Sequence, residues 1–476
     1  MKLLQEVHIG PKSPARFESL LGRESVAELE RTASLLQQRL DGRVIWNVNS
    51  TAVGGGVAEM LHSLLAYARG LGVDTRWIVI GGQADFFRIT KRLHNALHGD
   101  AGDGSNLGKA EREVYRQMTE ANAEELCNLV QARDFVILHD PQTAGMLPRL
   151  VDRGAYVLWR CHIGNDQRSD EGDRAWAFLA PYIERAHALI FSRFAYVPDF
   201  CDHGRSVIVP PSIDPFSPKN QELDEETVRA ILVRCGIVTA RGDERAPTFT
   251  LEDGSPSRVD RRADIATGGP PPSWETPLVV QVSRWDRLKD PVGVLQGFSR
   301  IPGFEERSAE LVLAGPDVSA VADDPEGVQT FDEVLEAWGA LDEPRRRRVH
   351  LINLPMEDLE ENAAIVNALQ RHATVIVQKS LREGFGLTVT EAMWKGRAVV
   401  ASAVGGIQDQ IEHGVSGLLL RDPTDLDAFA SCIGKLLDDP EFAGRLGRGA
   451  RRRASQLYLG LRSLTQYAGL IESLDR

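Results

Sequence analysis

Two glutamates, Glu383 and Glu391, stand eight positions apart in a segment suited to hold a phosphorylated sugar. The segment begins as a predicted strand, Thr374–Val377, passes through Gly384–Gly386 and continues with the apolar spacing of a helix. Where a strand ends in a glycine turn that opens a helix, backbone amides and the positive end of the helix dipole bind an anion. A carboxylate beside that point accepts the hydrogens of sugar hydroxyls. The helix dipole alone partly explains Glu383, but it explains Glu391 poorly.

Two cations follow another predicted strand in the same half of the chain. Arg284 and Lys289 come shortly after Leu278–Val282. A departing nucleoside diphosphate develops negative charge on its phosphate, and preorganised cations stabilise that charge. Surface ion pairs are the alternative, but the glutamate pair downstream favours a role in binding. The two motifs together indicate an enzyme that uses a nucleotide sugar.

The first half of the chain carries a glycine-rich turn. Gly54–Gly56 follow the predicted strand Arg43–Val48 and open a predicted helix, Val57–Leu71. Glycines let the backbone approach a ligand closely and point amides at a phosphate or a sugar hydroxyl. The spacing is not the GxGxxG of dinucleotide-binding proteins. A tight strand-to-helix turn without a ligand explains the motif equally well.

Polar side chains follow two further predicted strands, at the strand ends where ligands bind in open α/β sheets. Asp140 and Gln142 follow one strand and offer acceptors and donors suited to a polyol. Arg160 and His162 follow the next, one suited to a phosphate and the other to a sugar hydroxyl. Asp140 also fits a helix N-cap before Pro141, and a lone histidine in this setting is more often structural.

Alternating strands and helices form two series, which predicts parallel sheets covered by helices on both faces. The strand candidates of the first series are Arg43–Val48, Thr75–Ile80, Phe135–Leu138, Tyr156–Trp159, Ala188–Phe191 and Val207–Val209. Those of the second are Leu278–Val282, Glu310–Leu313, Val349–Ile352, Thr374–Val377, Ala398–Ala401 and Gly417–Leu420. We therefore expect an α/β fold of two Rossmann-like, doubly wound domains facing a cleft, spanning residues 1–214 and 215–457. Residues 239–277 are polar and Arg/Asp-rich, and we expect them to form a surface excursion that is mobile at least in part.

Composition and charge exclude several classes of protein. The 476 residues are 42% hydrophobic and 26% charged, which fits a globular chain of two domains. A net charge of −13 argues against a partner that is a nucleic acid or an anionic membrane. No apolar run approaches the ~20 residues that cross a bilayer, and the N-terminus lacks a secretion signal. The five cysteines are scattered without metal or redox spacing, so we expect a cytoplasmic protein.

The spacing of Glu383 and Glu391 resembles the Glu-x7-Glu hallmark of the retaining GT-B glycosyltransferases of family GT4. Narrower strings resemble the trehalose synthases of the glycosyltransferring type. These strings are Asn47–Thr51 with Gly54–Glu59, His139–Gln142, Trp159–Ile163, Pro210–Asn220 and Gln281–Pro291. The resemblance spans most of residues 40–470. The chain departs from the family pattern after Ile163, where Gly164-Asn-Asp166 stands in place of an expected Asp.

The resemblance implies transfer of glucose from a nucleoside diphosphate to C1 of free glucose, which gives α,α-trehalose with retained configuration. It implies catalytic roles for Arg284, Lys289 and Glu383. The residues it implies at the donor are Gly384, Phe385, Gly386, Leu387, Glu391, Gly55 and Gly56. Those it implies at the acceptor are Asn49, Asp140, Gln142, Arg160 and His162. It also implies that the tail, about residues 458–476, packs on the first domain.

By the same resemblance no cofactor is required, no metal ligands are expected, and Mg²⁺ is at most a stimulant. The partners are then a nucleoside-diphosphate glucose and glucose, and a homodimer is compatible with the resemblance. Three other functions stay open. One is a retaining trehalose phosphorylase, and another is a GT4 transferase with a different acceptor, such as a lipid or polysaccharide. The third is a non-catalytic nucleotide-sugar sensor, which the intact charged motifs disfavour.

Overall fold

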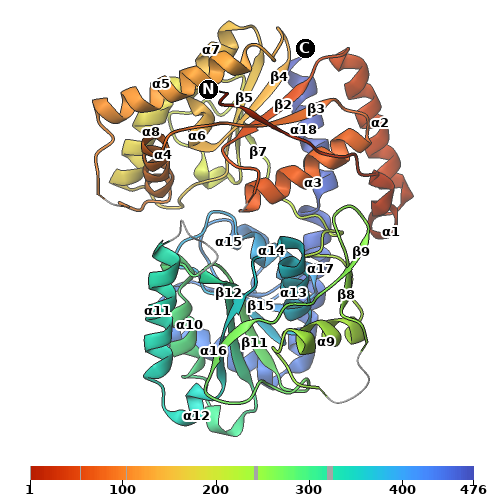
Figure 1. The fold of residues 1–476 in the computed structure, drawn as a ribbon, viewed down its shortest axis with the longest axis vertical. Coiled ribbons are helices and arrows are strands. Elements are labelled where there is room, and N and C mark those ends of the chain that lie inside the picture. The colour runs from red at the N-terminus through yellow and green to blue at the C-terminus, as the bar shows by residue number, and fades with distance from the viewer. Residues whose placement is uncertain (1, 54, 103, 241–244, 319–324, 476) are drawn as a thin grey trace. The chain divides into compact units, whose positions relative to one another are not determined.

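The structure is a computed structural model, and it describes residues 2–53, 55–102, 104–240, 245–318 and 325–475 (Figure 1). The chain divides into two compact units. The first runs to Ser212 and includes the chain again from Tyr458, whereas the second covers Ile213–Leu457. Gly54 and residues 241–244, which belong to segments singled out above, lie outside the described residues.

The first unit is built on a seven-stranded sheet in the order β1-β3-β2-β4-β5-β6-β7. Its strands are β1 (Gln5–Val7), β2 (Ile45–Asn49), β3 (Thr75–Val79), β4 (Phe135–His139), β5 (Tyr156–Cys161), β6 (Ala188–Phe191) and β7 (Ser206–Ile208). The six strands from β2 onward are parallel and match the predicted series within two residues at each end. Every residue of β2 and β4 is buried, as expected for a parallel sheet covered on both faces. The three-residue strand β1, which we did not predict, pairs antiparallel with β3.

Helices cover the first sheet, and one of them comes from the far end of the chain. The helices are α1 (Glu18–Leu21), α2 (Arg23–Leu40), α3 (Gly56–Gly70), α4 (Ala84–Leu97), α5 (Lys109–Leu126), α6 (Asp140–Ala144), α7 (Leu147–Asp152), α8 (Asp170–Ile183) and α18 (Gly460–Leu474). Ala468, Leu470 and Ile471 of α18 share a buried apolar cluster with residues of α2, β2 and β4. Figure 1 shows α18 in blue beside α2 in red, so the tail is an integral part of this core.

The second unit repeats the architecture with a seven-stranded sheet in the order β10-β13-β12-β11-β14-β15-β16. Its main strands are β11 (Leu278–Val282), β12 (Glu310–Pro316), β13 (Val349–Leu354), β14 (Val375–Gln378), β15 (Ala398–Ser402) and β16 (Leu418–Leu420). Its helices are α9 (Glu225–Arg234), α10 (Pro291–Phe298), α11 (Pro325–Gly339), α12 (Glu343–Arg346), α13 (Leu359–His372), α14 (Leu387–Trp394), α15 (Ile407–Gln410), α16 (Leu426–Asp438) and α17 (Pro440–Leu457). The six strands of the predicted series all form, and they are parallel. The two sheets confirm the predicted pair of doubly wound α/β domains.

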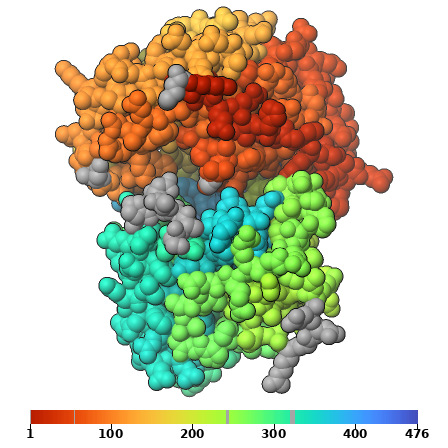
Figure 2. Space-filling model, in the orientation of Figure 1, coloured from red at the N-terminus to blue at the C-terminus, as the bar shows by residue number. Residues whose placement is uncertain are grey.

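The polar segment 239–277 is more ordered than its composition suggests. It lies between α9 and β11 and contains the strands β8 (Thr248–Thr250), β9 (Pro256–Arg258) and β10 (Asp264–Thr267). Strand β10 pairs antiparallel with β13 and so extends the main sheet by one strand, while β8 and β9 pair with each other. In Figure 2 the green atoms of this segment lie on the surface of the second unit. The sequence did not indicate these strands, because backbone pairing with a sheet edge gives strand structure to a segment that has no apolar periodicity.

Both sheets have a topological switch point. There the chain has added strands on one side of its first parallel strand and then crosses over to add strands on the other side. The switch point lies between β2 and β4 in the first sheet and between β11 and β14 in the second. Ligands of open α/β sheets bind beyond the carboxyl ends of the strands at such points. The motifs singled out in the sequence follow these four strands and β5.

Candidate functional site

In the second unit, the structure brings Lys289 and Glu383 together. Because β11 and β14 are parallel neighbours, the loops that follow them meet at the same sheet edge. The Nζ of Lys289 donates to Oε2 of Glu383 at 2.5 Å, and Ser380 Oγ donates to the same oxygen at 3.3 Å. The two charged side chains are only 16% and 11% exposed, so water screens the pair weakly. A cation and a carboxylate therefore lie together beyond the carboxyl ends of β11 and β14, at the switch point of the second sheet.

Several contacts hold these two loops in place, some within one loop and others between the two. The amide of Leu381 donates to the carbonyl of Leu288 at 2.8 Å, and Gln281 Nε2 donates to the carbonyl of Lys289 at 3.1 Å. Lys379, which has no exposed side-chain surface, forms an ion pair with Asp290. Lys379 was not among the predicted site residues, since no local pattern shows that a lysine after a strand will be buried. These contacts fix the backbone that carries Lys289.

The glycine turn before α14 has the predicted strand-turn-helix form. Gly386, at the N-cap of α14, has a φ of 84°, which a residue with a side chain adopts at a cost. Gln410 Nε2 donates to the carbonyls of Phe385 at 2.5 Å and of Gly386 at 3.3 Å. Gly406 donates its amide to the carbonyl of Gly384 at 2.9 Å, and a Cβ on Gly406 would lie 2.6 Å from the Phe385 ring. Gly406 and Gln410, at the two ends of α15, therefore hold the turn of Gly384–Leu387 in place. The sequence did not indicate this contact.

Glu391 occupies the fifth position of α14 and is 2% exposed. Its Oε1 lies 3.3 Å from Nζ of Lys219. Its Oε2 is buried and has no hydrogen-bond partner among the described residues. A carboxylate with one oxygen already paired and the other without a donor is suited to accept a hydrogen from a ligand.

Arg284 differs from the other predicted residues of this unit. Its side chain is 66% exposed, and Nη2 lies 3.4 Å from Oδ2 of Asp286. The structure thus joins Lys289 to Glu383 directly, while Arg284 and Glu391 have other partners. The guanidinium of Arg284 lies in solvent, where its side chain is able to turn toward an anion.

In the first unit, Asp140 and His162 meet at the ends of β4 and β5. The amide of His162 donates to Oδ1 of Asp140 at 2.7 Å. Burial raises the pKa of Asp140 to about 7, although the His162 amide and the charge of Arg160 oppose the shift. Asp140 also has a φ of 63°, in the left-handed region that Asp tolerates better than most residues. The predicted N-cap role is not observed, since Asp140 is the first residue of α6 and His139 occupies the N-cap.

A second histidine, which was not among the predicted site residues, links these residues to β2. His139 Nδ1 lies 3.1 Å from His162 Nε2, and His139 Nε2 lies 3.2 Å from Oδ1 of Asn47. Burial lowers the pKa of His139 to about 3 and holds the pKa of His162 well below its ordinary value, with Arg160 acting in the same direction. Both imidazoles are therefore neutral at pH 7, and each offers one donor and one acceptor.

Arg160 was predicted to face a phosphate, but its guanidinium is enclosed by other residues of the first unit. The side chain is completely buried. Its Nη1 donates to the hydroxyl of Tyr467 at 2.5 Å and its Nη2 to the carbonyl of Val209 at 2.9 Å, while Nε lies 3.1 Å from Nε2 of His162. The residue thus connects the end of β5 to α18. Only the tertiary structure brings residue 467 to this strand.

The remaining predicted residues of the first unit vary in accessibility. Asn49 is buried, accepts from Trp77 Nε1 at 2.8 Å and donates to the carbonyl of Thr51 at 2.7 Å, so it stabilises the turn after β2. Gln142 is half-buried on α6. Gly55 and Gly56 are exposed at the start of α3, and a Cβ on Gly55 would meet no atom within 4 Å. The space next to the Gly55 backbone is therefore open.

The departure from the family pattern after Ile163 has a packing reason. A Cβ on Gly164 would lie 2.1 Å from the ring of Tyr196, so a side chain does not fit there. Asp166, two positions on, forms an ion pair with Arg193. The packing against Tyr196 thus requires glycine at position 164, and the nearby carboxylate of Asp166 is paired with Arg193.

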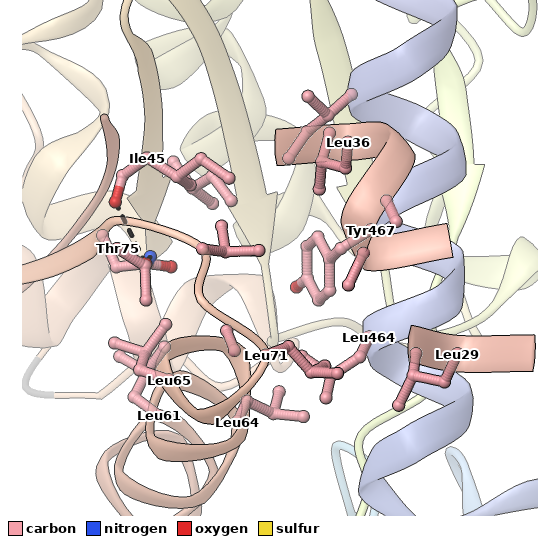
Figure 3. Close-up of a pocket in the computed structure, with 17 residues that line it drawn as sticks. Leu29, Leu36, Ile45, Leu61, Leu64, Leu65, Leu71, Thr75, Leu464 and Tyr467 are labelled. Carbon is pink, nitrogen blue, oxygen red and sulfur yellow. Dashed lines mark hydrogen bonds between the residues drawn. The ribbon is translucent and has the colours of Figure 1, made fainter. Parts of the chain in front are cut away.

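The first unit also contains an apolar cavity of about 70 Å³ (Figure 3). It lies between α2, α3 and α18, and Leu29, Leu64 and Leu464 are among the residues drawn around it. Asn47, Thr75 and Tyr467 are its polar lining residues. A sugar needs many hydrogen-bond partners, so this cavity is unsuited to a hexose or a nucleotide sugar.

Neither a cluster of metal ligands nor a membrane-spanning helix occurs among the residues that the structure describes. No group of three or more His, Cys, Asp or Glu side chains in these residues is arranged to hold a metal ion. Among the same residues, none of the helices combines the length and the apolar character that crossing a membrane requires.

Comparison with known proteins agrees with the fold and the motifs. Residues 271–453 match the family model described as Glycosyl transferases group 1, and residues 47–198 match that described as Trehalose synthase, N-terminal domain. An α,α-trehalose-phosphate synthase (UDP-forming) from Burkholderia xenovorans, solved with glucose-6-phosphate, has a similar structure. The TM-score is 0.65 at 16% identity, over 91% of this chain and all of that one.

Two parallel-sheet units with polar motifs at both switch points define a glycosyltransferase of the GT-B class, of the group 1 or GT4-like type. A trehalose synthase from Pyrococcus horikoshii is 34% identical over 475 residues, which are 99% of each chain. The chain therefore belongs to the trehalose synthase family. A trehalose phosphorylase from Pleurotus pulmonarius is 26% identical over 435 residues, which cover 86% of this chain and 54% of that protein.

Proposed function

We propose that this glycosyltransferase moves glucose from a nucleoside-diphosphate glucose to C1 of free glucose and forms α,α-trehalose with retained configuration. The observation that carries the proposal is the contact of Lys289 with Glu383 at the switch point of the second sheet. One charge suits the phosphate of the donor and the other suits the hydroxyls of its sugar. The similarity to proteins named trehalose synthase supports the product.

The proposed roles follow the chemistry of each group. Lys289 stabilises the charge that develops on the departing diphosphate. Arg284 turns its exposed side chain toward the same diphosphate and adds a second positive charge. Glu383 accepts hydrogens from hydroxyls of the donor glucose, and the amides of the glycine turn add a positive field. Glu391 accepts a hydrogen from the ribose through Oε2. Asp140, Gln142 and His162 of the first unit bind the sugars.

We propose a front-side displacement for the chemical step. The bond between C1 of the donor glucose and the phosphate oxygen breaks, and the C1 hydroxyl oxygen of the acceptor bonds to the same face of that carbon. The departing phosphate takes the hydroxyl proton. Glu383 is engaged by Lys289 and Ser380, which suits it to bind the sugar rather than to attack it. The proposal requires no cofactor and gives Mg²⁺ at most a stimulatory role.

The test is product analysis with purified protein and glucose, given UDP-glucose, ADP-glucose or GDP-glucose in separate reactions. We expect α,α-trehalose and the matching nucleoside diphosphate from at least one donor, with activity retained in EDTA. A Lys289→Ala variant is the control for contaminating activity. Trehalose formation from none of the three donors would refute the proposal.

A retaining trehalose phosphorylase is the second candidate, because one of the relatives carries that name. A parallel reaction with α-glucose 1-phosphate and glucose separates the two functions. Trehalose and inorganic phosphate from that mixture, without use of any nucleotide sugar, would favour the phosphorylase. A product with another acceptor would instead indicate a different transferase of the same class.

A further inference from the structure

The carboxylate of Glu391 is held asymmetrically. It lies on α14 with 2% of the residue exposed, and Lys219 Nζ approaches only Oε1, at 3.3 Å. Oε2 is buried, and no described residue donates a hydrogen bond to it. Buried polar atoms of folded proteins are nearly always hydrogen-bonded, so such an atom calls for a partner from outside the chain.

The backbone around Lys219 is fastened to the helices that carry the site. The carbonyl of Pro218 accepts from Asn367 Nδ2 at 3.0 Å, and the carbonyl of Asn220 accepts from Trp394 Nε1 at 3.0 Å. The side chain of Asn220 accepts from Nζ of Lys395 at 2.7 Å. The residues on both sides of Lys219 are thus bonded to α13 and α14. The ammonium that meets Glu391 is therefore positioned by the same helix as Glu391 itself.

A second lysine near Glu391 is a weaker source of positive charge. Lys395, the residue that caps the C-terminus of α14, is buried, and burial lowers its pKa to about 7 although Glu391 opposes that shift. Lys219 is 24% exposed and reaches water. Lys219 rather than Lys395 forms the ion pair with the carboxylate of Glu391, since Nζ of Lys395 donates to Asn220.

We propose that Lys219 is a positioning residue of the donor site: it occupies Oε1 of Glu391 and leaves Oε2 to accept a hydrogen from the ribose hydroxyls of a nucleoside diphosphate. The inference rests on the proposed function and adds Lys219 to it. Without the ammonium, the carboxylate is free to rotate or to take up a proton, and it then binds the diol less well. The segment Pro218–Asn220 thereby becomes part of the donor site rather than a plain connection.

The experiment compares each nucleoside diphosphate with its 2′-deoxy form by isothermal titration calorimetry. The probes are UDP, ADP and GDP with 2′-deoxy-UDP, 2′-deoxy-ADP and 2′-deoxy-GDP, and the pair that binds the wild-type protein is used throughout. The measured quantity is the ratio of the two Kd values, which isolates the ribose 2′-hydroxyl. We expect the 2′-deoxy form to bind the wild type about tenfold more weakly, as for loss of one charge-assisted hydrogen bond.

Two variants test Lys219 directly. Lys219→Ala removes the ammonium, and Lys219→Met keeps the apolar stem so that packing and folding are preserved. In both we expect weaker binding of the nucleoside diphosphate and a Kd ratio that falls toward one, with kcat at saturating donor within about threefold of the wild type. Lys219→Arg should restore part of the ratio. Arg451→Ala is the matched control, because Arg451 contacts Glu222 beside the same segment and lies over Trp394. Its Kd ratio should equal that of the wild type.

The binding results distinguish a failure of the role given to Lys219 from a failure of the proposed function. If none of the three nucleoside diphosphates binds the wild type, the donor of the proposed function fails. If the wild type binds both forms of a pair equally, the ribose role of Glu391 fails, and the role of Lys219 with it. If the wild type discriminates and the Lys219 variants discriminate equally well, only the role of Lys219 is overturned. Tighter binding by Lys219→Met with an unchanged ratio would also overturn it, since Lys219 would then merely cover the carboxylate.

Discussion

The ammonium of Lys289 lies 2.5 Å from Oε2 of Glu383, although 94 positions separate the two residues in the chain. The fold itself places the two side chains together, because their loops follow neighbouring strands and are joined by the backbone hydrogen bond from Leu381 to Leu288. A cation that is already oriented needs little reorganisation when a diphosphate binds. Glu383 therefore acts as the partner that keeps Lys289 at the sheet edge.

Replacing Lys289 by alanine should lower kcat of trehalose formation by at least ~100-fold, the scale for loss of one preorganised charge stabiliser. Steady-state kinetics with the best nucleotide-sugar donor provide the measurement. Arg287→Ala is the control, because Arg287 lies in the same short helical turn but pairs with Glu333 at an exposed position. Activity within a few-fold of the wild type in Lys289→Ala would rule out the role given to this lysine.

The raised pKa of Asp140 predicts a pH-dependent contribution to stability. Its ordinary value is 3.8 and its folded value is about 7, so between these values the folded state binds more protons than the unfolded one. This contribution therefore weakens as the pH rises through that window and is constant above it. Asp140→Asn is neutral at every pH, and Asn also tolerates the positive φ. The Tm of Asp140→Asn minus that of the wild type should increase from pH 5 to pH 8.

Burial and the charge of Arg160 set the low pKa values of the two histidines beside Asp140, and both proteins share these causes, so the histidines contribute alike to the two Tm values. Thermal unfolding followed by circular dichroism at several pH values is sufficient. A difference in Tm that does not change with pH would mean that Asp140 is ionised in the folded protein throughout the range.

The hydroxyl of Tyr467 should stabilise the first unit through Arg160. In Tyr467→Phe the buried guanidinium loses the acceptor that lies 2.5 Å from Nη1, and such a loss costs about 1–3 kcal/mol. Chemical denaturation measures the change in the free energy of unfolding. Tyr182→Phe provides the comparison, because the ring of Tyr182 packs on Tyr115 and Phe178. Equal changes in the two variants would contradict the role of the Tyr467 hydroxyl.

Filling the apolar cavity should raise stability. At roughly 24 cal/mol per Å³, a cavity of about 70 Å³ costs ~1.7 kcal/mol. Ala33→Leu, from the α2 wall, should recover about 1 kcal/mol and raise Tm by roughly 2–4 °C. Ser34→Leu adds the same side chain on the exposed face of α2 and should leave Tm unchanged. A lower Tm for Ala33→Leu would show that the walls are too rigid to accept the larger side chain.

The sequence by itself determined the two sheets and the strand-turn-helix form of the segment that carries Glu383 and Glu391. Runs such as Leu278–Val282 and Ala188–Phe191 are short and apolar, so their strand character is local and appears without coordinates. The spacing of Glu383 and Glu391 around a glycine turn is likewise a local pattern, and it was sufficient to predict the class of protein confirmed above.

Only the tertiary structure decided which charged side chains face one another and which are buried. Lys379 with Asp290, Lys219 with Glu391, and Arg160 with Tyr467 join residues between 89 and 307 positions apart. Whether a charge in such a pair is buried depends on the packing of every layer around it. A sequence pattern records periodicity over a few turns, whereas desolvation and ion pairing depend on distances set by the whole sheet. That is why Arg160 was expected at a ligand and instead fixes α18 to the end of β5.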